Sequence, residues 1–364
     1  MSDDAGPVWD EERVDALLLQ DRFDDILDEF RSAPAADLFM LGHRLASHNA
    51  LSQARALYRD LRARPKRPYE WFRLRILIPK IFHGDDRARE LAAYRTAVAD
   101  ELASVKHPAG RNHLVQALLC ADLALRDYDA FRERAQPFVG QPDLPRVLAA
   151  LVALLPRIKE PADVAERREK VFVIGLSKTG TKSITQALET MGYTTAHWVN
   201  PFTRALIDDD DFLLFDCCSD TPVSFRFEEL AGRFANARFI LTQRPLEPWM
   251  ASFRGHYARS HGVSELDAVR RRFDPAGELF HGPLYGRIHD RLYMRYGSLE
   301  EAYAAHDERV RDFFSGQARG RLLEFDMFRG DGWPELARFV GRPAPDEPFP
   351  WLGKAPNGDA ASTG

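Results

Sequence analysis

The sequence of 364 residues predicts two successive folds, an all-α helical-repeat (solenoid) domain followed by an α/β domain with a parallel sheet. Glycine usage predicts the division, because only 5 of the 23 glycines lie before residue 165, and an α/β domain needs more glycine for turns and tight loops. The spacing of apolar residues also changes, from three-to-four periodicity in the first part to short continuous runs after residue 170.

The first part is expected to form helices separated by short polar turns. The helices are expected at residues 10–18, 22–32, 36–47, 50–64, 70–82, 87–104, 111–126, 128–138 and 144–155. One pair resembles the tetratricopeptide repeat, in which small residues let two helices cross closely and an aromatic side chain fills the gap. That pair carries Leu41, Gly42, Ala54, Tyr58 and Pro65 near the offsets of this repeat. An irregular helical bundle is the alternative interpretation.

The second part alternates apolar runs with helical patterns, which is typical of a parallel sheet. Apolar runs occur at residues 171–174, 211–217, 238–242 and 321–325, and helices are expected around residues 183–191, 249–256 and 334–340. The first run is apolar throughout, as in a strand buried on both faces. The domains are therefore expected to span residues 1–165 and 166–355, with a flexible tail at 356–364.

Composition narrows the possible classes of protein. Hydrophobic residues make up 45% and charged residues 29% of the chain, as in a globular protein. A net charge of −5 argues against a nucleic-acid binder. The longest apolar run, Val147–Leu155, is far shorter than the roughly 20 residues of a membrane span, and no signal peptide is visible. Three cysteines, Cys120, Cys217 and Cys218, cannot build a disulfide framework. The chain is expected to be soluble and cytoplasmic, with Cys217 and Cys218 a buried pair.

The strongest local signal is the polar loop after the first expected strand, which reads Gly-Leu-Ser-Lys-Thr-Gly-Thr-Lys-Ser over residues 175–183. A strand, a glycine loop and a helix N-terminus together form an anion cradle. A nucleotide-triphosphate loop would place lysine directly after its second glycine, but Thr181 stands there and Lys178 lies inside the loop. The predicted anion-binding residues are Ser177, Lys178, Thr179, Gly180, Thr181, Lys182 and Ser183.

A second anion site is predicted where the strand at 238–242 ends. Arg244 follows this strand, and Ser252 lies eight places on, in the next expected helix. An arginine at the carboxyl end of a parallel strand points into the ligand crevice, and a serine early in the next helix faces the same anion. Pro245 and Glu247 suit the first turn of that helix.

These two sites resemble those of sulfotransferases that use 3′-phosphoadenylyl sulfate (PAPS). In that family a P-loop-like segment similar to Lys178–Thr181 binds the 5′-phosphosulfate, and its lysine contacts the oxygen that bridges phosphorus and sulfur. Arg244 and Ser252 have the spacing of the family's 3′-phosphate site. The resemblance covers about residues 170–352 and is to a bacterial and fungal branch in particular. Ser183 replaces the tryptophan with which the cytosolic animal enzymes stack adenine, and their C-terminal Arg-Lys-Gly motif is not evident.

The resemblance implies an enzyme that moves a sulfuryl group from PAPS to a hydroxyl and releases PAP, adenosine 3′,5′-bisphosphate. This transfer needs a general base and positive charge at the leaving phosphate. Two residues resemble base positions of the wider family: His197, at the end of a probable second strand, and Asp220, in an Asp-Thr-Pro segment. Histidine has the better pKa for this role at neutral pH. Lys178, His197 and Asp220 are the predicted catalytic residues, with His197 favoured as the base and Asp220 as its alternative or its orienting partner. No metal site is expected.

Two other functions remain open from the sequence. In a phosphate-loop kinase or NTPase, Phe212–Asp216 and Leu322–Asp326 would each be a strand ending in a magnesium-binding aspartate. The displaced lysine and the Arg244–Ser252 pair argue against it, because ATP has no 3′-phosphate. A non-catalytic repeat scaffold is the third interpretation. The acceptor could be a small molecule, a glycan, a lipid or a peptide, and the helical repeats could bind a protein partner. The acidic run Asp208–Asp211 is expected to be a solvated loop.

Overall fold

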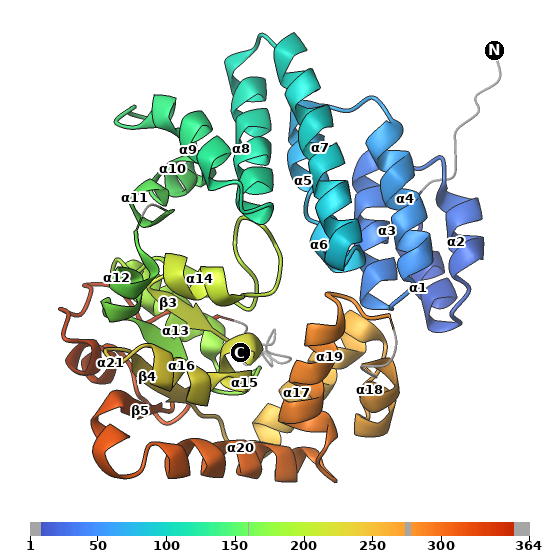
Figure 1. Cartoon of the computed structure of the whole chain (residues 1–364). Helices are drawn as coiled ribbons and strands as arrows, with labels where there is room; N and C mark the ends of the chain where they lie inside the picture. The colour runs from blue at the N-terminus through green and yellow to red at the C-terminus, as the bar shows by residue number, and fades with distance from the viewer. Residues whose placement is uncertain (1–8, 159, 274–277, 353–364) are drawn as a thin grey trace, which may run out of the picture. The chain divides into compact units, whose positions relative to one another are not determined.

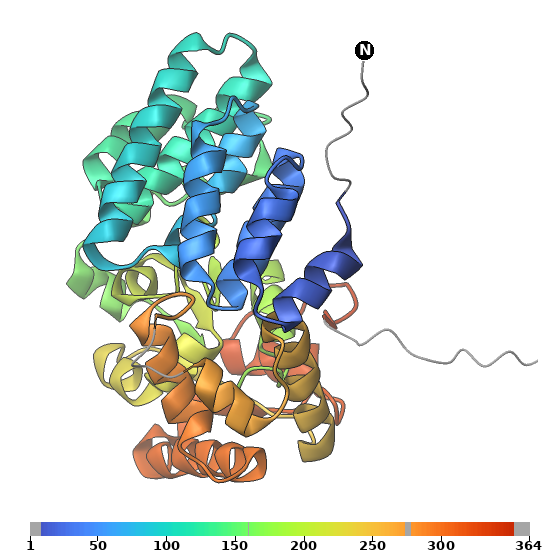
Figure 2. The same cartoon turned by 90° about the vertical axis from the view of Figure 1, so that its right-hand side faces the viewer.

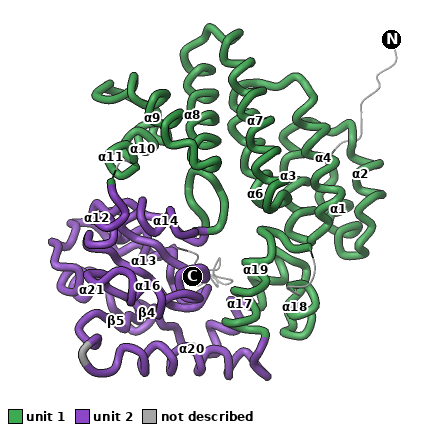
Figure 3. Tube along the Cα trace, viewed as in Figure 1, with its two compact units in different colours: residues 1–160, 199–206, 254–294 green, residues 161–198, 207–253, 295–364 purple. Residues whose placement is uncertain are grey.

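The computed structural model describes residues 9–158, 160–273 and 278–352. The chain divides into two compact units (Figure 3). Unit 1 comprises residues 1–160, 199–206 and 254–294, and unit 2 comprises residues 161–198, 207–253 and 295–364. Two segments from the second part of the sequence therefore fold with the helices of unit 1. The tail predicted at residues 356–364 lies outside the described residues.

Unit 1 contains helices and no strand in its described residues. These helices are α1 (Glu11–Leu19), α2 (Phe23–Phe30), α3 (Ala35–Ser47), α4 (Leu51–Ala63), α5 (Pro68–Leu74), α6 (Ile78–Ile81), α7 (Gly84–Ser104), α8 (Pro108–Ala124), α9 (Tyr128–Ala135), η1 (Gln136–Phe138), α10 (Arg146–Val152), α11 (Leu155–Ile158), α18 (Leu266–Arg272), α19 (Pro283–His289) and η2 (Asp290–Met294). Neighbours in sequence pack together, notably α3 with α4 and α7 with α8, as Figures 1 and 2 show.

The helix expected over residues 70–82 is interrupted. Helix α5 ends at Leu74 and α6 begins at Ile78, with a tight turn in which the Leu77 N–H donates to the Leu74 carbonyl at 3.2 Å. Pro79 explains the break, because proline lacks an N–H and its ring clashes with the carbonyl four residues earlier. A single helix across this segment was therefore a wrong prediction.

The helix pair α3–α4 packs closely at the small residues noted in the sequence. A Cβ on Gly42 would lie 3.1 Å from the Leu77 side chain and 3.7 Å from that of Leu57. Ala54 and Tyr58 are completely buried, and the Tyr58 ring meets Phe82 edge-on. Larger residues at these positions would push the helices apart.

Unit 2 is built on a five-stranded parallel sheet of order β2-β3-β1-β4-β5 (Figure 1), which confirms the predicted α/β class. The strands are β1 (Val171–Val173), β2 (Thr195–His197), β3 (Cys217–Ser219), β4 (Arg238–Thr242) and β5 (Leu322–Phe325). Around them lie α12 (Ala162–Arg167), α13 (Thr181–Thr190), α14 (Asp209–Leu214), α15 (Thr221–Phe225), α16 (Phe227–Arg233), α20 (Leu299–Phe313), η3 (Gly316–Arg321) and α21 (Trp333–Val340). Helix α17 (Leu246–His261) begins in unit 2 and ends in unit 1.

Strand β1 is buried on both faces, as its apolar run predicts. Phe172 packs against the rings of Phe212, Phe234 and Phe239 on one face, while Val171 and Val173 join a core with α13 and α21 on the other. The chain places β3 on one side of β1 and β4 on the other. In sheets of this kind, ligands bind where the strand order reverses, outside the carboxyl ends of the strands.

The acidic run Asp208–Asp211 does not form the expected solvated loop. Asp208 caps helix α14, because its side chain accepts from the Asp210 and Asp211 N–H groups, and the Asp211 carboxylate accepts in return from the Asp208 N–H at 3.1 Å. Asp211 is only 5% exposed. This reciprocal capping box explains the correction. Cys217 and Cys218 are both buried and free, as expected.

Candidate active site

The polar loop after β1 turns sharply before it enters α13. A Cβ on Gly175 would lie 2.6 Å from the Thr242 carbonyl oxygen, so only glycine lets the loop pass this close to β4. Lys178 and Gly180 both have left-handed backbones, with φ of 72° and 104°. The loop then delivers Thr181 to the first turn of α13, whose leading N–H groups have no acceptor within the helix. This arrangement is suited to an anion.

Two contacts hold the loop in place. The Trp249 indole Nε1 on α17 donates to the Ser177 carbonyl at 2.9 Å. The Thr179 hydroxyl donates to the Leu176 carbonyl at 2.6 Å and lies 2.6 Å from the Thr242 hydroxyl. Thr179 is thus buried inside the loop, and its hydroxyl supports the loop's shape.

The remaining polar residues of the loop lie in different surroundings. The Thr181 hydroxyl donates to Asp220 Oδ2 at 3.3 Å. Ser183 is fully buried, and its hydroxyl accepts the Leu352 N–H at 2.9 Å. Lys182 is exposed, whereas Lys178 is half-buried. The Thr181 hydroxyl therefore faces Asp220, and Ser183 lies against the C-terminal segment.

His197 and Asp220 meet at the carboxyl ends of β2 and β3. Their Nε2 and Oδ2 atoms are 3.3 Å apart. Asp220 has a left-handed backbone with φ of 77° and begins helix α15, where its Oδ1 accepts the Thr221 N–H at 2.6 Å. The other ring nitrogen of His197, Nδ1, lies 2.9 Å from the Ser219 hydroxyl. The structure thus brings both predicted base candidates into direct contact.

The electrostatics favour a neutral His197. Burial lowers the pKa of His197 below its ordinary value of 6.5, the Asp220 carboxylate opposes this effect, and the charges of Lys182 and Lys178 add to it. A neutral imidazole at pH 7 can accept a proton. Because the two loop lysines act on this histidine, the loop and the His197–Asp220 pair form one site.

Arg244 reaches the same loop from the end of β4. Its Nη1 donates to the Lys178 carbonyl at 3.2 Å, and its guanidinium lies 4.6 Å from the centre of the Phe328 ring. Within the described residues, its buried Nε has no hydrogen-bond partner. Ser252 lies half-buried in the second turn of α17 and makes no hydrogen bond to Arg244 in the described part of the chain. A half-buried cation with a buried, unused donor is suited to an anionic ligand.

Helix α20 holds two backbone segments of this site, one at Arg244 after β4 and one at Ile174 after β1. The Tyr303 hydroxyl accepts the Arg244 N–H at 3.1 Å and donates to the Arg244 carbonyl at 2.8 Å. His306 Nε2 donates at 2.7 Å to the carbonyl of Ile174, the residue that follows β1. Burial lowers the pKa of His306 to about 4 and raises that of Tyr303 to about 12, so both side chains stay neutral. The sequence contained these residues in a Tyr-x-x-His segment but did not indicate what they hold.

Of the two aspartates of the kinase interpretation, only Asp326 follows a strand. Residues 212–214 belong to helix α14, and Asp216 precedes β3, at the end of the sheet opposite the loop. Asp216 is bound there by Arg168 and Thr194. Asp326 does follow β5, but its Oδ1 accepts the Phe328 N–H at 3.0 Å. The segment at 212–216, which the alternative kinase interpretation takes as a strand ending in a magnesium-binding aspartate, is therefore not such a strand.

Within the described residues, no group of three or more His, Cys, Asp or Glu side chains has an arrangement that could hold a metal ion. None of the described helices combines the length and hydropathy that crossing a bilayer requires.

Comparison with known proteins identifies the family of this region. A family model described as "Sulfotransferase domain" matches residues 170–357, just over half of the chain. A curated protein of Aspergillus versicolor, "Ava biosynthesis cluster protein M", is 29% identical over 222 residues, which cover 50% of this chain and 80% of that protein. The family match includes the loop, the His197–Asp220 pair, Arg244 and Ser252.

Proposed function

Because the chain belongs to the sulfotransferase domain family, we propose that it transfers a sulfuryl group from PAPS to a hydroxyl acceptor and releases PAP. One observation carries the proposal: Arg244 and the polar loop are joined by the bond from Arg244 to the Lys178 carbonyl. Two cationic regions lie side by side, as a ligand with two separate anionic groups requires. PAPS carries such groups at its 5′ and 3′ positions.

PAPS is proposed to bind these residues in one orientation. The loop and the first turn of α13 would hold the 5′-phosphosulfate, with Lys178 near the bridging oxygen. Arg244, whose buried Nε lacks a partner in the described chain, would bind the 3′-phosphate together with Ser252. Ser177, Thr179, Gly180, Thr181, Lys182 and Ser183 are the other residues proposed to form the donor site.

The reaction would proceed by direct transfer between two oxygens. The acceptor oxygen forms a bond to sulfur while the bond from sulfur to the bridging oxygen breaks, and the acceptor proton moves to His197 Nε2. Asp220 Oδ2, 3.3 Å from this nitrogen, would stabilise the imidazolium that results. Lys178 would stabilise the charge that builds on the bridging oxygen. With these cations in place, we propose that transfer needs no divalent metal.

Calorimetry with PAP, AMP and ATP tests the donor site. PAP should bind at least tenfold more tightly than AMP or ATP, because only PAP places anions in both regions. Equal affinities for PAP and AMP would contradict the two-site arrangement.

The acceptor is proposed to be a hydroxyl-bearing small molecule, glycan, lipid or peptide. The relative's name refers to a biosynthesis cluster, which makes a small molecule the first acceptor class to test. Incubation of the protein with PAPS and a fractionated extract, followed by mass spectrometry, would identify the product as a species heavier by one sulfuryl group.

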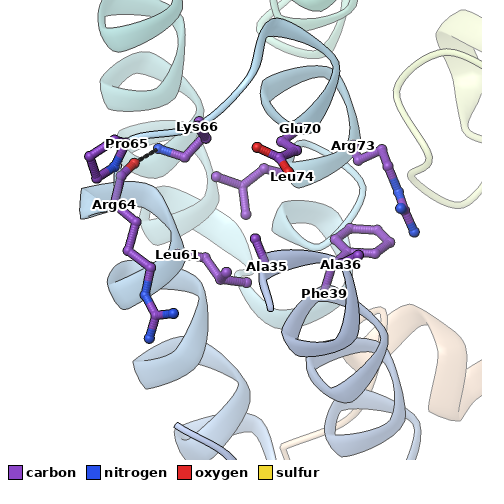
Figure 4. A pocket seen from close by; sticks show the side chains of 10 residues that line it. All are labelled: Ala35, Ala36, Phe39, Leu61, Arg64, Pro65, Lys66, Glu70, Arg73 and Leu74. Carbon is purple, nitrogen blue, oxygen red and sulfur yellow. Dashed lines mark hydrogen bonds between the residues drawn. The ribbon is translucent and has the colours of Figure 1, made fainter. Parts of the chain in front are cut away.

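We propose further that unit 1 is a tetratricopeptide-like solenoid that binds an acidic peptide of a partner protein. A small cavity of about 30 Å³ lies between α3, α4 and α5 (Figure 4). It is lined by Ala35, Ala36, Phe39, Leu61, Arg64, Pro65, Lys66, Glu70, Arg73 and Leu74. Of its three cations, Arg64 is paired with Asp60 and Lys66 donates to the Arg62 and Arg64 carbonyls. The single carboxylate, Glu70, is bound by Arg67. A small apolar side chain next to a carboxylate that meets Arg73 complements this surface.

An array of nine-residue peptides tests this surface. Peptides with a central Ala, Val or Leu flanked by Asp or Glu should bind, and the same peptides with Lys flanks should not. Arg73→Ala should weaken binding, because the Arg73 guanidinium stacks 4.5 Å above the Phe39 ring at the cavity. Arg89→Ala, an exposed arginine on α7, is the matched control. Equal binding of both peptide sets would exclude the proposed partner.

A further inference from the structure

Both ring nitrogens of His197 face side chains. Nδ1 lies 2.9 Å from the Ser219 hydroxyl, and Nε2 lies 3.3 Å from Asp220 Oδ2. The β2–β3 register sets the first contact, because His197 is paired with Ser219 across the two parallel strands. In a neutral imidazole one nitrogen carries the proton and the other accepts. A carboxylate only accepts, so Asp220 favours a proton on Nε2, but its oxygens already accept from the Thr181 hydroxyl and the Thr221 N–H. The groups at Nδ1 can therefore decide whether Nε2 is able to take a proton.

Ser219 belongs to a chain of hydroxyl groups that continues into helix α13. Its Oγ lies 2.7 Å from the Thr185 hydroxyl, and that hydroxyl donates to the Thr181 carbonyl at 2.8 Å. Ser219 is completely buried and Thr185 is only 6% exposed. Buried hydroxyl groups need hydrogen-bond partners within the protein, so this chain has to satisfy its own donors and acceptors.

The number of hydroxyl protons determines which group donates in each of these hydrogen bonds. Each hydroxyl has one proton, and that of Thr185 is directed to the Thr181 carbonyl. The 2.7 Å bond to Thr185 is then donated by Ser219, which leaves the Ser219 oxygen as an acceptor toward His197. Ser219 also lies 3.4 Å from the Ala196 carbonyl, and donation there would leave its oxygen an acceptor as well.

We propose that Ser219 and Thr185 are positioning residues that hold His197 as the tautomer with its proton on Nδ1, so that Nε2 receives the acceptor proton. The inference rests on the proposed role of His197 as the base. The hydroxyl chain ends on a backbone carbonyl of α13, the same helix whose first turn forms the anion cradle. One short element thus places the proposed donor site and sets the protonation of the proposed base.

Nitrogen NMR on protein labelled with ¹⁵N-histidine tests the tautomer without donor or acceptor. The chain has 11 histidines, and comparison with His197→Gln assigns the relevant signals. Above the pKa of His197, Nδ1 should show the shift of a protonated ring nitrogen and Nε2 that of an unprotonated one. A neutral His197 protonated at Nε2 would overturn the proposal, whatever the enzyme's activity.

The variant Thr185→Val sharpens the test, because it removes the acceptor that orients Ser219. Ser219 can then donate to Nδ1, and the tautomer should shift toward Nε2–H, with turnover about tenfold lower and PAP affinity unchanged. Thr185→Ser should restore the wild-type tautomer and turnover. Thr190→Val, on the exposed end of α13, should change neither the tautomer nor the turnover. An unchanged tautomer in folded Thr185→Val would contradict the role proposed for Thr185, because it would show that the Ala196 carbonyl alone orients Ser219. If Thr185→Val does not fold, the wild-type spectrum alone decides.

Discussion

Two aspartates at the opposite ends of β3 have contrasting surroundings. Asp216, at the amino end, accepts from Arg168 at 3.2 Å and from the Thr194 N–H and hydroxyl at 3.1 and 2.8 Å. Asp220, at the carboxyl end, has a left-handed backbone, and its Oδ2 lies 3.3 Å from both His197 and Thr181. The same residue type therefore meets permanent donors at one end and a titratable group at the other.

The difference is the basis for proposing a structural role for the Asp216 carboxylate and a functional role for that of Asp220. All the partners named for Asp216 keep their protons at neutral pH, so these bonds hold the strand end in one state. The partner of Asp220 can gain and lose a proton, and two lysines from the anion-binding loop act on that partner. Backbone strain of the kind seen at Asp220 concentrates at functional sites. The carboxyl ends of the strands thus carry the residues of the proposed chemistry, and at its amino end β3 is held by the bonds to Asp216.

The largest expected effect is the loss of turnover in His197→Ala. General-base catalysis contributes roughly 100- to 10,000-fold, so turnover should fall by that factor, while PAP affinity stays nearly unchanged because a base touches only the acceptor. Steady-state rates and calorimetry measure the two quantities. Near-normal turnover in this variant, together with inactive Asp220→Asn, would show that Asp220 is the base.

Arg244→Ala should produce the next largest effect, on PAP affinity. Loss of a desolvated charge pair costs about 2–4 kcal/mol, or roughly 30- to 1,000-fold in the dissociation constant. Arg238→Ala is the matched control, because Arg238 begins the same strand at its amino end. Calorimetry should show unchanged PAP affinity for Arg238→Ala. Equal losses in both variants would remove the distinction between the two ends of the sheet.

The two aspartates should separate function from stability. Asp220→Asn should lower turnover by less than His197→Ala, and the two losses should not add, because both act on one proton transfer. Asp216→Asn should leave turnover intact but lower the free energy of unfolding by about 1–3 kcal/mol, since buried donors lose a charged acceptor. Rates and urea unfolding curves for both variants are the measurements. Inactive but stable Asp216→Asn would contradict the structural role.

The smallest effect is a shift in pH dependence. Burial lowers the pKa of His197 below 6.5, so turnover should decline only when the pH falls through this lower value. Because the Asp220 carboxylate raises this pKa, Asp220→Asn should move the acidic limb of the rate profile to lower pH. An acidic limb that moves to higher pH in Asp220→Asn would show that the Asp220 carboxylate does not raise the pKa of His197.

His197 also makes the stability of the folded protein depend on pH. Its pKa is lower in the folded than in the unfolded chain, so its contribution is complete above pH 6.5 and is lost as the pH falls through the folded value. His197→Gln should therefore flatten the dependence of the melting temperature on pH in this acidic range.

Local sequence patterns were sufficient to predict the loop and the strands β1, β2, β4 and β5, whereas the run at residues 211–217, expected as a strand, forms most of α14 and the first residue of β3. The run at residues 238–242 became β4 with the expected bounds, and His197 ends β2 as predicted. Short apolar, β-branched segments bounded by glycine and charge are characteristic of buried parallel strands. The spacing of Asp208 and Asp211 also fits a capping box at the start of α14. The charge of the run alone does not show this.

The contacts that position the site could not be predicted in this way. Trp249 supports a loop carbonyl 72 positions earlier, and Tyr303 fixes Arg244 across 59 positions. Thr185 and Ser219 are 34 residues apart in sequence. Such contacts depend on how strands are ordered and how helices cover the sheet, and neither has a local sequence signal.

Transfer of ³⁵S-labelled sulfate from PAPS to an extract, with EDTA present, tests the central claim most directly. The account predicts a labelled product with the wild-type chain and undiminished labelling in EDTA, whereas His197→Ala gives at most about one hundredth of the rate. Labelling that EDTA abolishes and magnesium restores, or an active His197→Ala, would contradict the proposed site.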